Sequence, residues 1–348
     1  MPKSVVVEGA YLRDILDQPR ALQATLSALD VSQELAGLAR RLAAGRFLRV
    51  VLTGMGSSFH ALHPLHLELI GQGVSSVMAE TSELIHHQKR LFDPKTLMVA
   101  VSQSGRSAET VRLLELNRGR SPVIGVTNTP GSPLALRADA VVMTDAGSEF
   151  SVSCKTYLSA LLALDWLGAV LGGRELGARR RALGQAVPAV SSYLAGWRGH
   201  VHDLAGWFQG VRHLFLVGRG ASLAAVGTGA LTIKESDHFP AEGMSSAAFR
   251  HGPFEMLSPE VRVLVFAGDR LTSGLNAGLV RDIRSHRGRA ELVAEGATRP
   301  ALRLPVAAPG LRPVLEMLPV QMSTLALAAS AGREAGRFAL AAKVTTKE

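Results

Sequence analysis

The stretch FLRVVLTGMGSSFHAL (residues 47–62) indicates the fold, because an apolar β-rich run passes through a Gly-x-Gly-x-Ser turn directly into a helical pattern. The stretch HLFLVGRGASLAAVGTGAL (213–231) repeats this order, and the two glycines of each turn match at an offset of 164 residues. The same offset places the strand of residues 99–110 on residues 263–274. A constant offset over this length indicates an internal duplication.

The domain organisation follows from this duplication. Apolar β-rich runs alternate with helical patterns throughout the 348 residues, which is typical of parallel α/β layers. We therefore predict an α/β fold of two tandem domains, each a doubly wound, flavodoxin-like parallel sheet flanked by helices. The expected parts are an N-terminal helical arm, a first domain, a linker helix, a second domain and a C-terminal tail, at residues 1–29, 30–170, 171–194, 195–330 and 331–348.

The composition favours a cytoplasmic protein with a large core. Hydrophobic residues make up 47% of the chain and charged residues 19%. Cys154 is the single cysteine, so no intrachain disulfide can form and a reducing compartment is the default. The N-terminus lacks the apolar core of a signal peptide. The longest apolar run, residues 158–173, contains Asp165 and is too short to span a membrane, so we expect a buried helix there and no membrane partner.

The formal net charge of +9 raises the question of nucleic-acid binding. The basic residues are scattered, and the single tight run is Arg179-Arg180-Arg181. Aromatic residues make up only 5% and are not interleaved with the basic ones, which leaves few surfaces on which bases could stack. We therefore expect no nucleic-acid partner, and a positive field would also suit a small anionic substrate.

The glycine turns do not carry the signature of a dinucleotide site. The third glycine of Gly-x-Gly-x-x-Gly is replaced by Phe59 in the first copy and by Leu223 in the second, and no P-loop motif is present. Histidines gather near the first turn, but no carboxylate or cysteine completes a metal-ligand set around His60, His63, His66, His86 and His87. We expect neither a cofactor nor a metal.

Short hydroxyl side chains mark two turns of the first copy. They are Ser57 and Ser58 after the first strand and Ser102, Ser104 and Ser107 after a later one. Helix N-termini carry unpaired N–H groups and a partial positive charge, which favour a phosphate. The alternative is that each serine is only a helix N-cap, but five serines on two neighbouring turns favour phosphate.

The second copy lacks this pattern. Its turns read Ala221-Ser222 and Ala267-Gly268-Asp269, and an aspartate there would repel a phosphate. The first copy is therefore the predicted phosphate binder, and a small phosphorylated metabolite is the simplest ligand.

Several motifs in this order resemble the sugar isomerase (SIS) domain family and, within it, the isomerase half of glucosamine-6-phosphate synthases. They are GMGSSFHA (54–61), TSELIHH (81–87), SQSGRSAET (102–110), TNTPGSPLA (127–135), GSEFSVSCKT (147–156), IKESDHFPAEG (233–243) and FRHGP (249–253). The resemblance implies that the phosphate of a sugar is bound by Ser57, Ser58, Ser102, Gln103, Ser104 and Ser107.

The resemblance also implies three catalytic residues. Glu235 would carry the proton between C1 and C2, His251 would assist ring opening, and Lys343 would meet the sugar carbonyl. Each role suits its chemistry. A carboxylate can move a proton next to a carbonyl, a histidine titrates near neutral pH, and a desolvated lysine can form an imine.

The sequence departs from the family pattern in four ways. Thr232 stands where the synthases have a lysine, and Arg106 where they have an acidic residue. The tail lacks the Pro-Arg that precedes the family lysine, and we expect no glutaminase domain, because the sequence begins at the segment that resembles the family's linker. Arg106 would either contact the phosphate or face solvent.

Without a source of ammonia, the sensible direction is release of an amine. We therefore expect an amino-sugar 6-phosphate deaminase or isomerase. The alternatives are a fructosamine-6-phosphate deglycase, a plain aldose–ketose isomerase, or a non-catalytic sugar-phosphate sensor.

The segment between the two expected catalytic residues suggests how the sites are assembled. His251 follows Glu235 by sixteen residues, beyond an extended-looking segment that contains Pro240 and Gly243. The resemblance implies a symmetric homodimer in which this histidine enters the pocket of the partner, giving shared active sites.

Overall fold

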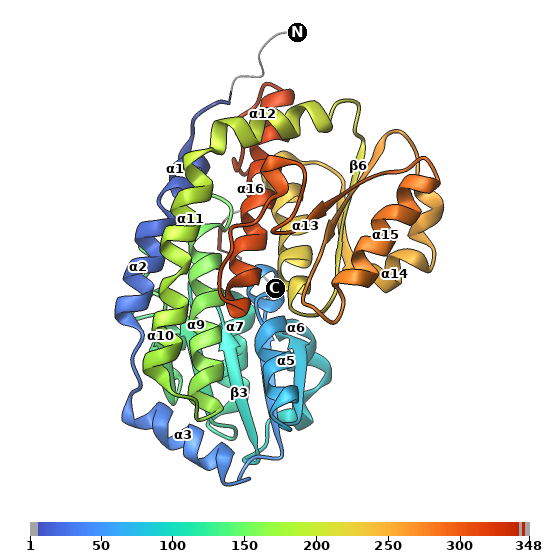
Figure 1. Ribbon diagram of the computed structural model, residues 1–348. Coiled ribbons are helices and arrows are strands. Elements are labelled where there is room, and N and C mark those ends of the chain that lie inside the picture. Colours follow the sequence, from blue (N-terminus) through green and yellow to red (C-terminus); the bar gives the residue numbers. More distant parts are fainter. Residues whose placement is uncertain (1–5, 341–342, 345–348) are drawn as a thin grey trace. The chain divides into compact units, whose positions relative to one another are not determined.

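The computed structural model describes residues 6–340 and 343–344 (Figure 1). Residues 1–5 of the expected N-terminal arm, and residues 341–342 and 345–348 of the expected tail, lie outside the described residues. The chain forms two compact units. What we call the five-stranded unit holds residues 20–149, 155–184 and 343–344, and the four-stranded unit holds residues 6–19, 150–154 and 185–340.

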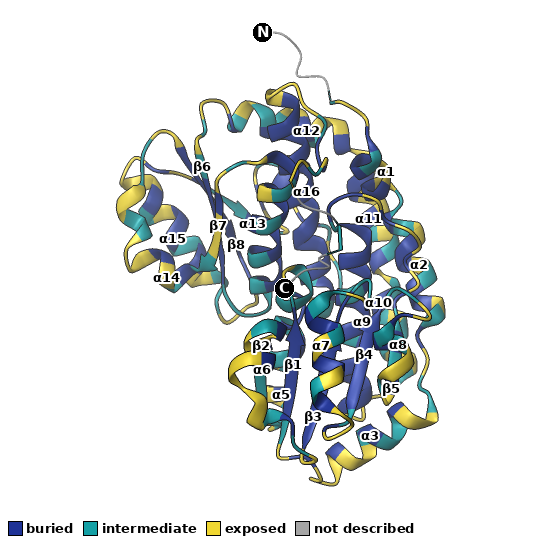
Figure 2. Ribbon diagram, turned by 180° about the vertical axis from the view of Figure 1, so that it is seen from behind, coloured by how far each residue is buried: buried dark blue, intermediate teal, exposed yellow. Residues whose placement is uncertain are grey.

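The five-stranded unit is built on one parallel sheet with the strand order β2-β1-β3-β4-β5. Its strands are β1 (Arg49–Gly54), β2 (Ser76–Glu80), β3 (Thr96–Val101), β4 (Val123–Thr127) and β5 (Ala140–Met143). The strand order reverses between β1 and β3, which is the doubly wound arrangement. All residues of β3 and β4 are buried, as expected of parallel strands covered on both faces (Figure 2).

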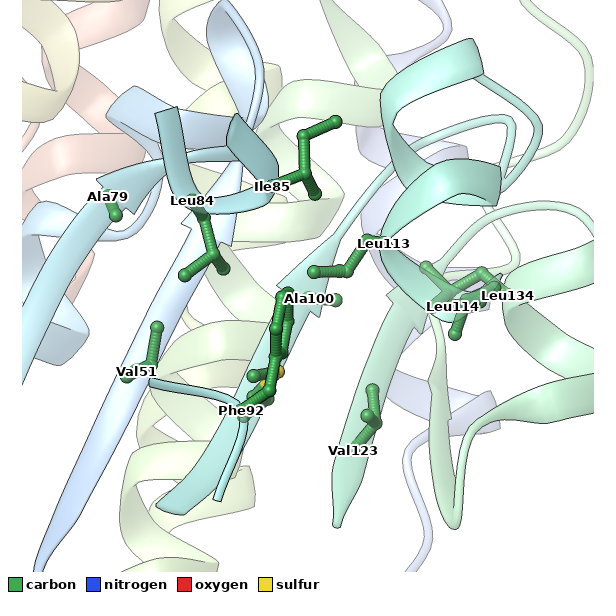
Figure 3. Packing of buried hydrophobic residues seen from close by; sticks show 11 residues of the cluster. Val51, Ala79, Leu84, Ile85, Phe92, Ala100, Leu113, Leu114, Val123 and Leu134 are labelled. Atoms are coloured by element: carbon green, nitrogen blue, oxygen red, sulfur yellow. The ribbon is translucent and has the colours of Figure 1, made fainter. Parts of the chain in front are cut away.

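Helices from consecutive crossovers pack on this sheet. Figure 3 shows Leu84 of one helix and Leu113 of another extending toward the strands that carry Val51 and Ala100. The helices of this unit are α2 (Gln18–Ala28, which begins in the other unit), α3 (Gln33–Ala43), α4 (Ser57–His60), α5 (His63–Gly71), α6 (Thr81–His87), α7 (Ala108–Asn117), α8 (Pro133–Arg137), α9 (Lys155–Leu171) and α10 (Leu176–Gly184), with a 3₁₀ turn at Lys89–Leu91. The buried helix expected at residues 158–173 is confirmed as α9, which is buried along almost its whole length.

The four-stranded unit repeats the architecture with the order β7-β6-β8-β9, again all parallel. Its strands are β6 (His213–Gly218), β7 (Ala241–Ser245), β8 (Val261–Phe266) and β9 (Arg289–Val293). Its helices are α1 (Ala10–Leu16), α11 (Ala186–Ala195), α12 (Trp197–Trp207), α13 (Leu223–Asp237), α14 (Ser246–Arg250), α15 (Ser273–Ser285) and α16 (Arg312–Ser330). Its 3₁₀ turns are Gly220–Ser222, Pro253–Met256, Pro300–Leu302 and Pro309–Leu311.

The two sheets bear out the predicted α/β class with tandem parallel sheets. The offset is 164 residues between β1 and β6 but 165 between β2 and β7 and between β3 and β8, so the second copy is one residue longer before its second strand. The last strand also differs. Where the first sheet has β5, the described part of the second has a single parallel bridge between Ala294 and Arg303. Within the described residues, no helix is both long enough and apolar enough to cross a bilayer.

Candidate active site

The two serine-bearing turns lie at the carboxyl ends of adjacent strands. Gly54, the last residue of β1, pairs with Val101, the last residue of β3. Ser57 and Ser58 follow the first strand and Ser102 follows the second, so both turns lie at the point where the strand order reverses. In open α/β sheets the ligand crevice forms at this position. The sequence therefore places its hydroxyl groups at the edge of the sheet where a ligand is expected.

The loop after β3 is shaped by Gly105. Its φ is +61°, and a side chain on it would overlap the side chain of Ser132, which caps α8 by accepting a hydrogen bond from Ala135 N at 3.2 Å. The main chain of Gly105 also accepts a hydrogen bond from Leu134 N at 3.2 Å. Both the backbone conformation and the close approach therefore require glycine.

The first two serines of this loop order it internally. Ser102 is buried, and its Oγ accepts a hydrogen bond from Gly105 N at 3.1 Å. Ser104 Oγ accepts one from Arg106 N at 3.2 Å. Each contact uses an oxygen lone pair, which leaves the hydroxyl hydrogen as a donor for a ligand oxygen. Arg106 itself is exposed.

Ser107 is a helix cap. Its Oγ accepts a hydrogen bond from Thr110 N at 3.4 Å and lies 2.8 Å from Thr110 Oγ1, at the start of α7. The capping alternative therefore holds for this serine, and its contact with a phosphate stays a prediction. The N-terminus of α7 opens at the same loop, and it adds backbone N–H groups and a partial positive charge.

The loop after β4 fixes the main chain at Gln103. The carbonyl oxygen of Gln103 accepts hydrogen bonds from Thr127 Oγ1 at 3.2 Å, Asn128 N at 3.0 Å and Thr129 Oγ1 at 3.3 Å. The side chain of Asn128 then holds the segment after β5, because its amide donates to Gly147 O at 2.9 Å and its carbonyl accepts from Ala146 N at 2.7 Å. Three consecutive loops at this edge of the sheet are thus tied together.

Two residues after Gly147 lies Glu149, which is not among the site residues expected from the sequence. Its side chain is fully buried, and Oε2 accepts hydrogen bonds from Thr156 Oγ1 at 2.6 Å and from the Lys343 ammonium at 2.7 Å. The available signal was its place in the quoted stretch GSEFSVSCKT, in the segment that leads into α9. The structure thus places Lys343 in the same unit as the serine loops.

The other two expected catalytic residues lie in the four-stranded unit. Glu235 is half-buried on α13, one turn after the buried Thr232, and Asp237 follows it at the end of the helix. Burial raises the pKa of Asp237 to about 8, against the opposing effects of Ser236 and Arg333. His251 is exposed directly after α14. The arrangement of Glu235 and His251 around a ligand of the serine loops stays a prediction.

Three of the histidines near the first turn, His60, His63 and His66, are partly buried. The rings of His60 and His63 stack with centroids 6.3 Å apart, and His66 Nδ1 lies 3.0 Å from Ser76 Oγ. Burial, with the neighbouring His60 and His66, lowers the pKa of His63 to about 4. No group of three or more histidine, cysteine or acidic side chains that could hold a metal is found among residues 6–340 and 343–344.

In the second copy, the equivalent turns donate hydrogen bonds to carboxyl groups of the chain itself. Ser222 Oγ donates to Glu316 Oε1 at 2.8 Å, and Glu316 is fully buried on α16. Burial raises the pKa of Glu316 to about 8, against the opposing effects of Ser222 and Arg312. After β8, Asp269 Oδ1 accepts from Leu271 N at 3.0 Å and from Thr272 N at 3.1 Å.

Comparison with known proteins finds a family that matches the segment with the serine-bearing turns. Residues 47–169, which contain both serine-bearing turns, match the SIS domain family. A glutamine–fructose-6-phosphate aminotransferase (isomerizing) of Pyrococcus horikoshii is 27% identical over 98% of this chain and 58% of its own length. The chain thus spans less than two thirds of this curated relative.

Two solved structures show the same fold. The C-terminal domain of glucosamine-fructose-6-phosphate aminotransferase from Francisella tularensis superposes with a TM-score of 0.80 at 19% identity, covering 93% of this chain and 97% of that one. Glucosamine-6-phosphate deaminase from Thermotoga maritima superposes with a TM-score of 0.77 at 17% identity, covering 97% and 100%. Together with the family match, these likenesses confirm the resemblance to the SIS family that the motifs indicated.

Proposed function

This chain contains an SIS domain, and from that premise we propose that it interconverts an aldose- or amino-sugar 6-phosphate and a ketose 6-phosphate. The observation that carries the proposal is the pair of serine-bearing turns at the reversal point of the five-stranded sheet. Hydroxyl donors, backbone N–H groups and the N-terminus of a ten-residue helix converge there. This combination suits a dianionic phosphate ester better than a neutral ligand.

The proposed roles divide between binding and proton transfer. Ser57, Ser58, Ser102 and Ser104 donate hydrogen bonds to the phosphate, with Gln103 and Ser107 beside them. Glu235 removes the proton next to the carbonyl carbon and returns it to the neighbouring carbon. His251 moves the ring-hydroxyl proton that opens the sugar, and the Lys343 amine meets the carbonyl.

We propose further that the sugar carries an amino group and that the reaction takes up one water and releases ammonia, the oxygen of the water becoming the ketose carbonyl oxygen. The relative from Pyrococcus horikoshii is named for amino transfer to fructose 6-phosphate, which supports an amino-sugar substrate. The same name includes an isomerizing activity, which supports plain aldose–ketose isomerisation as the second candidate. No metal ion or nucleotide enters either proposal.

The experiment that tests the function is a substrate panel. The full chain is incubated with glucosamine 6-phosphate and its galacto epimer, and ammonia and ketose 6-phosphate are measured. We expect both products, and Glu235→Gln should keep substrate binding but lower turnover by about 10²–10⁴-fold.

The other outcomes of this panel each replace the proposal. Interconversion of glucose 6-phosphate and fructose 6-phosphate without ammonia would leave the plain isomerase. Release of a larger amine from a fructosamine 6-phosphate would indicate a deglycase. Binding of these sugar phosphates without any turnover would indicate a sensor.

We also propose that two copies of the chain share each site, with His251 reaching the partner. The exposure of this histidine, directly after the short helix α14, supports the proposal. Glu235→Gln and His251→Ala are each expected to be nearly inactive. Mixed under conditions of subunit exchange, they should recover about a quarter of wild-type activity, because half the dimers are mixed and each mixed dimer has one intact site. No recovery would place both residues in a site formed by one chain.

A further inference from the structure

The amine of Lys343 is held by a buried carboxylate. Its Nζ lies 2.7 Å from Oε2 of Glu149, whose side chain is fully buried, while the lysine side chain is 22% exposed. The two residues are 194 positions apart in the chain, so the contact joins Lys343 to a distant segment of the five-stranded unit. Neither the motif pattern nor the family comparison assigns a role to this glutamate.

Glu149 is anchored independently of the lysine. Its Oε1 accepts a hydrogen bond from Thr156 N at 3.1 Å, and its Oε2 accepts one from Thr156 Oγ1 at 2.6 Å. Thr156 lies in the first turn of the 17-residue helix α9, where unpaired N–H groups favour a negative charge. Two residues before the carboxylate, Gly147 O is held by Asn128 Nδ2. The carboxylate is therefore fixed to the same framework as the serine loops.

Lys343, unlike the firmly anchored Glu149, has a long and flexible side chain. A lysine side chain has about 2 kcal/mol of rotamer entropy, so without a fixed partner its amine samples many positions. Removing the cation from a buried carboxylate is strongly disfavoured, so Glu149 is expected to keep the Lys343 ammonium beside it. The N-terminus of α9 thus fixes the position of the Glu149 carboxylate, and the charge of this carboxylate holds the Lys343 amine.

We propose that Glu149 is a positioning residue that docks the Lys343 amine at the ligand edge of the five-stranded sheet. This inference rests on the proposed function for its kinetic consequence, because the docked amine is the one that meets the sugar carbonyl. Glu149 acts through Lys343, so its effect on turnover should exist only while the lysine is present.

A kinetic double-mutant cycle tests this dependence. Glu149→Gln should lower kcat by about 10–100-fold, the usual effect of misplacing a reacting group by about 1 Å, and leave KM within about twofold. In the Lys343→Met background the same substitution should change kcat by less than about twofold. Equal losses in both backgrounds would overturn the proposal, because they would indicate a merely structural carboxylate.

The control is Glu115→Gln. Glu115 belongs to the same unit and forms an exposed ion pair with Arg112 at 3.2 Å, so it matches the charge change without touching the lysine. It should leave kcat and KM unchanged.

A conservative variant tests whether the charge of Glu149 is what matters. Glu149→Asp, which keeps the charge on a shorter side chain, should recover part of the activity lost in Glu149→Gln.

A second measurement does not depend on turnover. The full chain is treated with acetic anhydride, and acetylation of Lys343 is followed over time by mass spectrometry. Loss of the carboxylate should make Lys343 react about fivefold faster in Glu149→Gln, while Glu115→Gln should react like the wild type. This result decides the docking contact even if no sugar phosphate is turned over, so failure of the proposed function is distinguishable.

A third variant covers the case in which Glu149→Gln does not fold. Thr156→Val keeps both charges and removes the hydroxyl that donates to Glu149 Oε2. It should raise the acetylation rate of Lys343 by about twofold, less than Glu149→Gln, because the backbone hydrogen bond to Oε1 remains. Unchanged acetylation of Lys343 in every folded variant of Glu149 or Thr156 would show that the lysine is not docked there, and the proposal would fall.

Discussion

The two units share a topology but treat the donors at the ligand edge of the sheet differently. In the five-stranded unit, Ser102 and Ser104 accept hydrogen bonds from their own loop and keep their hydroxyl hydrogens for an incoming group. In the four-stranded unit, the Ser222 hydroxyl donates to Glu316, and Asp269 accepts the N–H groups after β8. One copy presents donors, and the other satisfies its donors with its own carboxyl groups.

The comparison shows that the two copies keep the strand–turn–helix unit at the ligand edge, while the polar groups in their loops differ. A strand–turn–helix unit always presents N–H groups at the start of its helix, and these groups need an acceptor. A ligand phosphate is one solution and an internal carboxylate is another. A carboxyl group built into the chain would exclude a phosphate from the second copy.

The largest expected effect is on substrate binding, where serine substitutions in the first copy should raise KM and one in the second copy should not. Ser102→Ala with Ser104→Ala should raise KM for the sugar phosphate on the order of a hundredfold, because hydrogen bonds to a charged group are worth about 1.5–3 kcal/mol each. Ser222→Ala in the second copy should leave KM within about twofold. Steady-state kinetics on both variants measures the contrast, and an equal rise in both would mean that the two copies bind phosphate alike.

The next effect concerns stability against pH in the four-stranded unit. The pKa of Glu316 is raised by burial to about 8 in the folded chain, from an ordinary value of 4.5. The folded state therefore holds the proton more tightly than the unfolded state. The stabilisation is fully present below pH 4.5 and is lost as pH rises through 8.

Glu316→Gln removes this titration but keeps an acceptor for Ser222. The variant should match the wild type near pH 5 and exceed it at pH 8 by about 2–4 kcal/mol in unfolding free energy. Thermal or urea unfolding across this pH range gives the measurement. A constant difference between variant and wild type would show that Glu316 does not titrate in this window.

A largely buried carboxyl group of the five-stranded unit should affect stability at lower pH than Glu316 does. There, burial raises the pKa of Asp165 to about 6, with the ion pair to Arg179 opposing it. The contribution of this proton to the unfolding free energy is present below pH 3.8 and is lost as the pH rises through 6. Between pH 6 and 8 the dependence should come from Glu316 and from Asp237, whose pKa is also raised to about 8.

The smallest effect concerns the turn after β8. Asp269→Ala removes the acceptor for Leu271 N and Thr272 N and should lower the unfolding free energy by about 1 kcal/mol. Its KM should stay at the wild-type value. Ser107→Ala removes the cap of α7 at a similar cost of about 1 kcal/mol, but it should also raise KM. A rise in KM for Asp269→Ala would extend the binding site to the second copy.

Much of the fold could be predicted because short stretches of the sequence indicate the strands and turns. The apolar runs at residues 49–54 and 213–218 are continuous, as buried parallel strands require, and the glycine turns mark their ends. The one-residue change of offset before β7 was missed, because glycine register fixes the turn and not the length of the following helix. The loss of a full fifth strand in the second copy was also not visible in the pattern.

The candidate site could be predicted only in part. Ser102, Ser104 and their neighbours were found because helix-start chemistry is local in sequence. That Ser107 is a cap needed its contact with Thr110. Glu149 and Glu316 were not selected, because a glutamate in a sequence gives no sign of whether it will be buried or which distant group it will meet.

The sequence by itself determined the α/β class, the duplicated strand–turn–helix unit and the serine-rich turn, since periodicity and helix-start chemistry depend on neighbours a few residues apart. Only the tertiary structure decided which carboxyl groups meet which donors. Lys343 meets Glu149 across 194 residues, and Ser222 meets Glu316 across 94. Such pairs form where packing brings distant segments into the same low-dielectric surroundings, and there burial strengthens the attraction between the groups and makes an unpaired charge costly.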